Sequence, residues 1–317
     1  MVSRILVRAS ESERLQQLAM GDGIAGQLTG RITHRFIAGE ELGQAIEVAR
    51  ELNLTGRTVT LDLVGEKVRD EADADVAAID YRGTIAAMAE DVVRSGVSIK
   101  PSQLGAALDL ARTRERLSEL AAAAGKAGLH LTLDMEDHTT VERTIELVEA
   151  LHAEGHTHVG CAVQTALHRT PEDIARLNEL GASLRLCKGA YAEPVSVAHQ
   201  DRDAIDEAYA VAARELLAHG TYPRFATHDH RLIGTIRRDA RELGRGRESY
   251  EFQMLYGIRT DVQQRLIDIG ERLCVYVPFG QAWYPYFVRR LAERPANLLF
   301  FARALLPSPT VTATPAP

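Results

Sequence analysis

Residues 159–187 read VGCAVQTALHRTPEDIARLNELGASLRLC, and this stretch contains one complete unit of a pattern that recurs along the chain. It opens with an apolar run, Val159–Val163, which predicts a buried strand. A helix is predicted over Pro171–Leu180, because Thr170 supplies an N-cap, proline is favoured in the first turn and a glycine stands beyond the end. A second apolar run, Ser183–Cys187, follows at once. Two buried strands joined through a helix form the repeating unit of a parallel sheet.

The same pattern extends in both directions, as eight short apolar runs separated by helical stretches. Many of the runs lack strict alternation, which is typical of strands buried on both faces of a parallel sheet. Eight strands that alternate with helices predict an α/β fold of the TIM-like type, a (β/α)8 barrel. The predicted strands are Thr58–Val64, Val97–Ile99, Leu129–Leu133, Val159–Val163, Ser183–Cys187, Arg224–Thr227, Tyr250–Met254 and Leu273–Val277. The predicted helices include Ser102–Ala124, Thr139–His152, Pro171–Leu180, Asp203–Ala218 and Asp261–Ile269.

A doubly wound open sheet is the alternative arrangement of the same elements. Its dinucleotide-binding form carries a GxGxxG fingerprint directly after the first strand. No such fingerprint follows Thr58–Val64. The barrel is therefore the favoured prediction.

The two ends of the chain differ in composition from the barrel. Residues 1–31 are polar and helix-prone, which predicts a short N-terminal helical extension. Residues 307–317 are rich in proline, threonine and alanine, which predicts a flexible, disordered C-terminal tail. The barrel domain is expected to occupy residues 32–306.

Charge and cysteine content exclude several classes of protein. The net charge is −7, from 37 basic and 44 acidic residues, which argues against a nucleic-acid partner. Cys161, Cys187 and Cys274 lie far apart without CxxC spacing and fit reduced thiols better than disulfides. The N-terminus lacks the apolar stretch of a signal peptide, and no run of about 18 apolar residues predicts a membrane span. A cytoplasmic protein is expected.

Polar residues crowd at the carboxyl ends of the predicted strands, where barrel enzymes place their active sites. Charged groups at such buried edges cost several kcal/mol unless they are paired. The pattern therefore predicts a functional site at this end of the barrel. These residues are Lys100, Asp134, Glu136, Gln164, Lys188, Tyr191, His228, Asp229 and Tyr276.

One face of the last predicted helix carries an unusual set of side chains. Tyr286, Arg289, Arg290 and Glu293 have the spacing i, i+3, i+4, i+7, so they lie on one face. Guanidinium groups bind carboxylate or phosphate through paired hydrogen bonds. The face is suited to a small anion with an apolar body. A solvated helix face with a salt bridge is the alternative interpretation.

Six short motifs, in order along residues 32 to 305, resemble those of the proline dehydrogenase family. The family's Ser-(Val/Ile)-Lys-Pro-(Ser/Thr) motif, for example, is similar to the run that contains Lys100. The opening of the helix that carries Arg289 and Arg290 also fits the family. The motifs are RFIAGE at 35–40, SIKPS at 98–102, LDME at 133–136, RLCKGAY at 185–191, ATHD at 226–229 and YEFQMLYG at 250–257.

The resemblance implies both a fold and a reaction. The family has a distorted (β/α)8 barrel that binds FAD without covalent attachment. It oxidises L-proline to Δ1-pyrroline-5-carboxylate, with hydride transfer from proline C5 to flavin N5, and passes the electrons to a membrane quinone. This is the first step of proline catabolism to glutamate. A monofunctional enzyme is expected, coupled functionally to a pyrroline-5-carboxylate dehydrogenase and peripheral on the inner face of the membrane.

The resemblance also assigns roles to individual residues. Arg289 and Arg290 match the pair that binds the proline carboxylate, and Lys100 adds a third positive charge. Aromatic side chains surround the pyrrolidine ring, and a saturated ring offers them little except apolar contact; their counterparts here are Tyr276 and Tyr286. The positions treated as catalytic are Asp134 and Tyr191, with Asp134 expected to pair with Lys100.

The predicted FAD-binding residues come from several strands. Arg185 matches an arginine beside the flavin N5 edge, where positive charge favours the reduced flavin. Gly189 allows close approach of the backbone to the cofactor. The complete set is Met135, Gln164, Arg185, Lys188, Gly189, Ala190, Thr227, His228 and Glu293. No metal site is predicted.

One residue departs from the family pattern. Asp229 stands where the family usually has asparagine. An ionised carboxylate cannot donate the hydrogen bond that an amide donates. The affinity for FAD or the local network of hydrogen bonds is expected to differ.

Other hypotheses compete with a flavoenzyme. His228, Asp229 and His230, with Asp134 and Glu136, could indicate a metallohydrolase, although their spacing gives no clear ligand set. Lys100 or Lys188 could serve as the nucleophile of a Schiff-base lyase. A third hypothesis is a non-catalytic regulator that binds flavin or proline.

Overall fold

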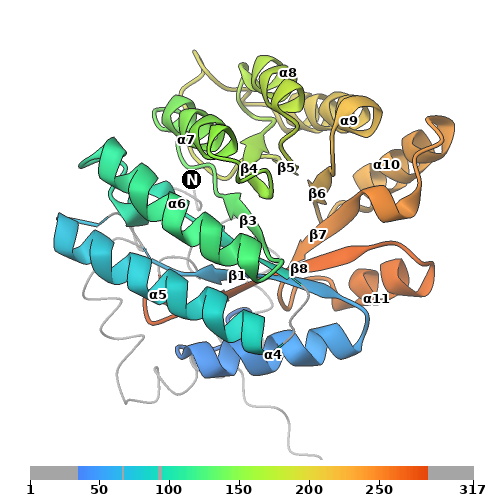
Figure 1. Ribbon diagram of the computed structural model, residues 1–317. Helices are drawn as coiled ribbons and strands as arrows, with labels where there is room; N and C mark the ends of the chain where they lie inside the picture. The colour runs from blue at the N-terminus through green and yellow to red at the C-terminus, as the bar shows by residue number, and fades with distance from the viewer. Residues whose placement is uncertain (1–34, 66–67, 92–94, 285–317) are drawn as a thin grey trace, which may run out of the picture. The chain divides into compact units, whose positions relative to one another are not determined.

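Eight parallel strands close into a barrel in the computed structural model, which describes residues 35–65, 68–91 and 95–284. Each strand pairs with its neighbour in the chain, and β8 pairs again with β1 (Figure 1). The prediction of a (β/α)8 barrel is confirmed, and the doubly wound open sheet is wrong. The strands are β1 (Thr58–Leu63), β2 (Ser95–Ile99), β3 (His130–Leu133), β4 (Val159–Gln164), β5 (Leu184–Cys187), β6 (Arg224–Ala226), β7 (Glu251–Leu255) and β8 (Leu273–Phe279).

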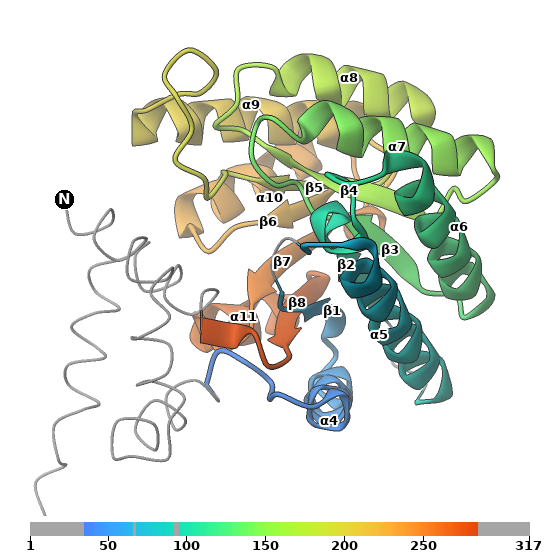
Figure 2. The same ribbon diagram turned by 90° about the vertical axis from the view of Figure 1, so that its left-hand side faces the viewer.

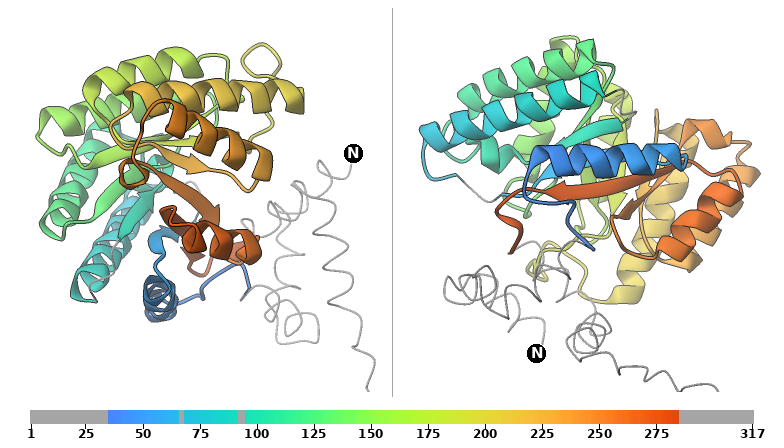
Figure 3. Two further views of the ribbon diagram at one scale, coloured as in Figure 1. Left: turned by 90° about the vertical axis from the view of Figure 1, so that its right-hand side faces the viewer. Right: turned by 90° about the horizontal axis from the view of Figure 1, so that it is seen from below.

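Helices surround the strands in the order of the chain, as Figures 1 and 2 show. Consecutive helices from α5 to α10 contact one another around the outside of the barrel. The two further views in Figure 3 show the same outer layer. The helices are α4 (Leu42–Leu54), α5 (Glu71–Glu90), α6 (Leu110–Lys126), α7 (Val141–Ala153), α8 (Thr170–Leu180), α9 (Arg202–His219), α10 (His230–Glu242) and α11 (Thr260–Asp268), with short 3₁₀ turns η1 (Pro101–Leu104) and η2 (Arg247–Ser249).

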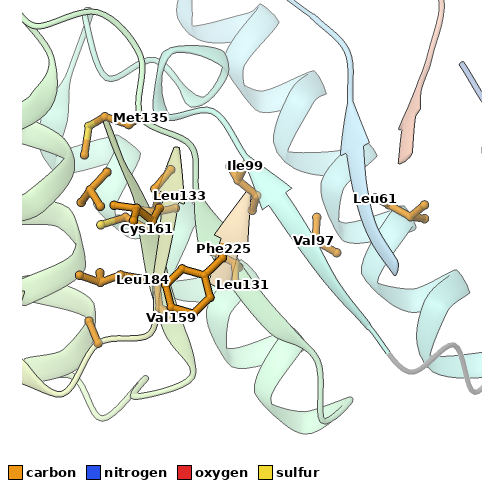
Figure 4. Close-up of a cluster of buried hydrophobic side chains, with 14 of the residues drawn as sticks. Leu61, Val97, Ile99, Leu131, Leu133, Met135, Val159, Cys161, Leu184 and Phe225 are labelled. Carbon is orange, nitrogen blue, oxygen red and sulfur yellow. The ribbon is translucent and has the colours of Figure 1, made fainter. Parts of the chain in front are cut away.

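The hydrophobic core of this barrel is the layer between strands and helices. Alternate residues of each strand contribute to it, since successive side chains of a strand point to opposite faces. Figure 4 shows part of this layer, and its labelled side chains are buried. They are Leu61, Val97, Ile99, Leu131, Leu133, Met135, Val159, Cys161, Leu184 and Phe225.

The interior of the barrel, by contrast, is filled with polar side chains. Arg185 of β5 donates to Ser98 of β2 at 2.8 Å, and Arg224 of β6 donates to Thr132 of β3 at 3.1 Å. These strands are not neighbours in the sheet, so the side chains meet inside the barrel. All four residues are buried. The strands are therefore buried on both faces, as the sequence predicts, but the inner face is held together by hydrogen bonds.

One predicted helix is divided in two. The sequence predicts a single helix over residues 102–124, whereas the structure has the turn η1, a loop, and then α6. Gly105 ends η1 with φ of +89°, a conformation that glycine adopts readily. Asp109 then caps α6, because its carboxylate accepts hydrogen bonds from the backbone N–H groups of Ala111 and Arg112.

The start of α8 also differs from the prediction. Thr170 is the first helical residue rather than the N-cap, and Arg169 occupies the capping position without a side-chain cap. The Thr170 hydroxyl instead donates to the carbonyl oxygen of Gln164 at 2.5 Å. This bond ties the helix to the end of β4. The end of the helix is as predicted, with Gly181 left-handed at φ +78°.

The barrel belongs to a compact unit, Ala38–Gln281, and the other described residues, 35–37 and 282–284, group with the chain's two ends in a second unit. The predicted extension over residues 1–31 and tail over 307–317 lie outside the described residues. The boundaries of the predicted domains therefore stay predictions. Among the described helices, none combines the length and apolar character needed to cross a bilayer.

Candidate active site

The predicted site residues of the barrel gather at one edge, because all eight strands run in the same direction. This edge is formed by the carboxyl ends of the strands, the position of active sites in barrel enzymes. Lys100 follows β2, Asp134 and Met135 follow β3, Gln164 ends β4, Lys188 to Tyr191 follow β5, Thr227 and His228 follow β6, and Tyr276 lies in β8.

Asp134 is the centre of the polar cluster at this edge. Its Oδ1 accepts hydrogen bonds from Ser98 Oγ at 2.7 Å and from Arg185 Nη1 at 2.6 Å. Its Oδ2 accepts from the Tyr276 hydroxyl at 2.8 Å, and Lys100 Nζ lies 3.8 Å away. Groups from three strands or their ends, β2, β5 and β8, thus converge on one carboxylate. The predicted pairing of Asp134 with Lys100 is present, but Arg185 is the closer cation.

Arg185 is buried inside the barrel, with 3% of its surface exposed. Its Nε donates to Gln253 Oε1 at 2.7 Å, and its Nη1 donates to Ser98 Oγ and to Asp134 Oδ1. Its guanidinium lies over the Tyr276 ring, 5.1 Å from the ring centroid. Burial alone would lower the pKa of Arg185, but the surrounding groups, with the Asp134 carboxylate as the strongest of them, together outweigh burial and raise that pKa. The guanidinium is therefore held charged and fixed in direction.

Lys100 has a second partner that the sequence did not indicate. Its ammonium forms an ion pair with the carboxylate of Asp62 in β1, which is completely buried. Burial by itself lowers the pKa of Lys100, but the charges of Asp62 and Asp134 outweigh that effect and raise it. Lys100 therefore stays protonated, and much of its charge is balanced within the protein.

Lys188 lies in a separate group of charges beyond the ends of β5 and β6. Its ammonium pairs with Asp206 of α9 and lies 3.6 Å from Asp229 Oδ2. Asp229 caps α10, since its carboxylate accepts from the backbone N–H of Arg231 at 2.9 Å. Burial alone would raise the pKa of Asp229, but the hydrogen bonds from Arg231 and the charge of Lys188 lower it. The residue that departs from the family pattern is therefore a helix cap.

Replacement of Asp229 by asparagine is expected to keep the cap but remove its charge. At about pH 7 the free energy of unfolding should fall by about 0.5 kcal/mol, because a carboxylate at a helix N-terminus is favourable. The pKa of Asp229 is depressed in the folded protein, so its contribution is present above the unfolded value of 3.8 and is lost as pH falls through the folded value. Urea unfolding of wild type and Asp229→Asn should converge at about pH 3.

Asp229→Ala is the matched control, because alanine offers no cap at any pH. It should cost about 1.5 kcal/mol at about pH 7, where both the cap and the charge are lost, and about 1 kcal/mol at about pH 3, where only the cap is lost. If the asparagine and alanine variants lost the same free energy of unfolding at neutral pH, the assignment of Asp229 as a cap would be contradicted.

The loop after β5 brings a glycine against the end of β4. Gly189 has φ of +110°, and a Cβ there would lie 3.1 Å from Ala166 Cβ and 3.2 Å from Gln164 Oε1. A side chain at this position would thus be strained and crowded. Gln164 is buried and its Nε2 donates to the carbonyl oxygen of Glu136 at 2.7 Å. Of the remaining predicted residues here, Ala190 and Tyr191 are exposed and Met135 is buried.

Thr227 and His228 are held by hydrogen bonds to the backbone. Thr227 Oγ1 accepts from the backbone N–H of Asp229 at 3.1 Å. His228 Nε2 accepts from the backbone N–H of Leu255 at 3.0 Å. An N–H group can only donate, so His228 Nε2 carries no proton and the neutral ring has its hydrogen on Nδ1. Thr227 is thus tied to the segment that follows β6, and His228 is tied to the end of the neighbouring strand β7.

Tyr286, Arg289, Arg290 and Glu293 lie outside the described residues. Their predicted roles in binding substrate and cofactor stay predictions. Four of the predicted site residues meet in the described cluster, and they are Lys100, Asp134, Arg185 and Tyr276.

Three residues of the cluster were not among the predicted site residues. Ser98 and Gln253 lie within the motifs at 98–102 and 250–257, but the resemblance assigned them no role. Asp62 lies inside the first predicted strand. A carboxylate within an otherwise apolar, β-branched run is the signal that identifies it, because a buried charge requires a partner.

The arrangement of histidines and carboxylates gives no support to a metallohydrolase. Within the described ranges, no three side chains of metal-binding type are grouped to hold an ion. His152 and His158 each place Nε2 within 2.9 Å of a backbone carbonyl oxygen, where the ring donates. His228 is occupied by a backbone N–H, as described above.

The family described as proline dehydrogenase matches residues 45–303 of this chain. The chain is 37% identical to the proline dehydrogenase of Deinococcus radiodurans over 309 residues, which covers 96% of this chain and 97% of that protein. It is 36% identical to proline dehydrogenase 2 of Bacillus subtilis over 266 residues, which covers 84% and 88% of the two chains.

The fold agrees with this match. A crystal structure of proline utilization A from Bdellovibrio bacteriovorus, inactivated by N-propargylglycine, superposes with a TM-score of 0.81 at 22% identity. That superposition covers 99% of this chain and 41% of the other, and it shows a shared fold. From the family match and the two curated relatives, this chain belongs to the proline dehydrogenase family.

Proposed function

We propose that this chain oxidises L-proline to Δ1-pyrroline-5-carboxylate, with FAD as the bound electron acceptor. Membership of the proline dehydrogenase family supports oxidation of proline. The charged cluster around Asp134, at the carboxyl ends of the strands, is the location that we assign to the reaction.

One buried atom carries the flavin part of this proposal. Among the described residues, Arg185 Nη2 has no hydrogen-bond partner, although the side chain is almost completely buried. A buried donor without a partner costs free energy, so a ligand that accepts its hydrogen bond is favoured there. The edge of a flavin ring presents nitrogen and oxygen acceptors, and an adjacent positive charge stabilises its reduced form.

Other residues of the cluster fit the remainder of FAD. Gly189 has a positive φ and lies against Gln164. Because it has no side chain, a cofactor can approach its backbone closely. We assign the cofactor to Met135, Gln164, Arg185, Lys188, Gly189, Ala190, Thr227 and His228, with Glu293 from the part of the chain outside the described residues. When bound, FAD supplies a two-electron acceptor for the hydride of proline C5.

The side chains of the chain itself bind and orient the substrate in this proposal. Lys100, Arg289 and Arg290 bind the proline carboxylate, because charge-assisted hydrogen bonds fix the direction of a small anion. Tyr276 and Tyr286 cover the pyrrolidine ring and exclude water from it. The ring of Tyr276 is held in place at its hydroxyl by Asp134.

Asp134 and Tyr191 are the residues that we propose as catalytic. The amine of proline must lose a proton before or during the loss of the hydride, and that proton passes to the carboxylate of Asp134 or to solvent. Lys100 is excluded as the proton acceptor, since its pKa is raised and it is already protonated. The same fact weighs against a Schiff-base lyase that uses Lys100, because a nucleophilic amine must be unprotonated.

The decisive experiment is the anaerobic visible spectrum of the purified full chain, reconstituted with FAD, before and after addition of L-proline. Bleaching of the oxidised flavin band is expected, with D-proline as the matched control that leaves the band unchanged. A bound flavin that stays oxidised would contradict the proposed reaction and favour a regulator. Trapping of a carbonyl substrate by borohydride without flavin would favour the lyase.

We further propose that a membrane quinone reoxidises the flavin and that a pyrroline-5-carboxylate dehydrogenase consumes the product. The chain would then work in the cytoplasm, with peripheral contact to the membrane. These statements rest on the resemblance to the family. Addition of a soluble quinone analogue to the proline-reduced protein should restore the oxidised spectrum, and failure to do so would remove the quinone from the proposal.

A further inference from the structure

We propose that Asp62 is a positioning residue of the active site, which holds Lys100 as an ammonium directed towards the opening of the barrel. The inference rests on the proposed function in one respect, the assignment of Lys100 to the substrate carboxylate. It adds a residue that neither the family motifs nor the predicted site contains.

The place of Asp62 in the sheet determines what it can reach. It lies opposite Ser98 in the register of β1 and β2, and Lys100 stands two residues after Ser98, directly beyond the end of β2. Asp62 and Lys100 form an ion pair in this position. The Asp62 side chain is 0% exposed, whereas that of Lys100 is 18% exposed. Asp62 therefore lies beneath the lysine and acts through it, rather than on a bound substrate.

The other groups around Lys100 show why Asp62 is needed. Asp134, at 3.8 Å, is shared with Arg185, which is closer to it at 2.6 Å. Glu136 is more distant and binds the backbone N–H and hydroxyl of Ser102. Asp62 is thus the carboxylate most directly committed to Lys100.

Neutral groups from two further elements complete these surroundings. Tyr81 of α5 accepts a long hydrogen bond, 3.4 Å, from the backbone N–H of Lys100, and its own hydroxyl donates to Gln103. Tyr276 of β8 donates to Asp134. Neither tyrosine supplies a charge that could replace that of Asp62.

The two members of the pair depend on one another for their ionisation. Burial raises the pKa of the Asp62 carboxyl, and the ammonium of Lys100 is the largest influence in the opposite direction. Burial lowers the pKa of Lys100, and the Asp62 carboxylate is the largest influence that raises it. Without Asp62, the effect of burial on the pKa of Lys100 is opposed chiefly by Asp134, whose charge Arg185 already neutralises. The pKa of Lys100 should then fall towards the neutral range.

The test is the pH dependence of anion binding in Asp62→Asn, a substitution that keeps the shape of the side chain and removes its charge. The probe is cyclopentanecarboxylate, whose single ionisable group is charged from about pH 6 upwards. Its dissociation constant is measured by calorimetric titration of the full chain reconstituted with FAD. The dissociation constant of wild type should change less than about twofold between about pH 7 and pH 9. The affinity of Asp62→Asn should fall about tenfold over that range, as Lys100 deprotonates.

Two further variants isolate the charge of Lys100. Asp80→Asn makes the same change of charge at an exposed position of α5, and it should behave as wild type does. Lys100→Arg in the Asp62→Asn background should remove the pH dependence, because arginine stays protonated throughout this range. If Asp62 had only a structural role, Lys100→Arg would not restore the binding that Asp62→Asn loses.

A pH-independent affinity in Asp62→Asn, with wild type binding the probe, would overturn the inference and leave the proposed function intact. A wild type that neither binds the probe nor is reduced by L-proline would overturn the proposed function and this inference with it. If Asp62→Asn does not fold, Lys100→Met and Asp62→Asn/Lys100→Met are compared by flavin binding and thermal unfolding. A double variant at least as stable as Lys100→Met supports the inference, since both members of the pair are then gone, and a double variant that is less stable overturns it.

Discussion

Replacement of Arg185 by methionine is expected to lower the free energy of unfolding by about 3–5 kcal/mol. Methionine has similar length but leaves the partly buried carboxylate of Asp134, which is 15% exposed, without its closest cation. It also leaves Gln253 Oε1 without the donor that now lies at 2.7 Å. Because an uncompensated buried charge costs more than a lost surface contact, the effect should be among the largest of any single substitution in the barrel.

The same variant should lose activity with L-proline by at least about a hundredfold, because a fixed positive charge at the developing negative charge is removed. The measurements are urea unfolding and steady-state oxidation of L-proline with a quinone analogue. Arg176→Met is the matched control. Arg176 pairs with Glu142 and Glu149 but is 39% exposed, so its loss should cost less than about 1 kcal/mol and leave activity unchanged. Similar losses of stability for both variants would contradict the special position of Arg185.

Replacement of Asp134 by asparagine is the second change with a large expected effect. The carboxylate accepts three hydrogen bonds, from Ser98, Arg185 and Tyr276, and donates none. An amide has only one acceptor oxygen, and its NH₂ group would face at least one of these donors. Arg185 and Lys100 would also lose a shared counter-charge. We expect a loss of about 2–4 kcal/mol in stability and at least about a hundredfold in kcat.

Tyr276→Phe separates the contribution of one hydrogen bond from that of the charge. Phenylalanine keeps the ring over Arg185 and removes only the donor to Asp134, so it should cost about 1 kcal/mol. Thermal unfolding and kcat measured on both variants give the comparison. If Tyr276→Phe is as damaging as Asp134→Asn, then the hydroxyl, rather than the carboxylate, is the centre of the network.

Much of the fold could be predicted because it depends on local patterns. All eight strands were predicted within one or two residues of their observed ends, since each is a short apolar run between turn residues. The single helix predicted over residues 102–124 was wrong, because a 3₁₀ turn and the cap at Asp109 interrupt it. The predicted role of Thr170 as an N-cap was also wrong, because its hydroxyl donates to a carbonyl oxygen of the preceding strand. Both differences come from contacts at helix ends, where several conformations have similar energies.

The sequence by itself determined the alternation of strands and helices, the family and the edge of the barrel at which the polar residues gather. These follow from periodicity, from motifs and from the common direction of parallel strands. Only the tertiary structure decided which side chains meet inside the barrel. Closure of the sheet brings Asp62, Lys100, Asp134 and Arg185 from four different segments into one charged cluster. A buried charge takes its partner from whichever strand faces it, and that choice depends on the register and closure of the sheet, which no local run of residues specifies.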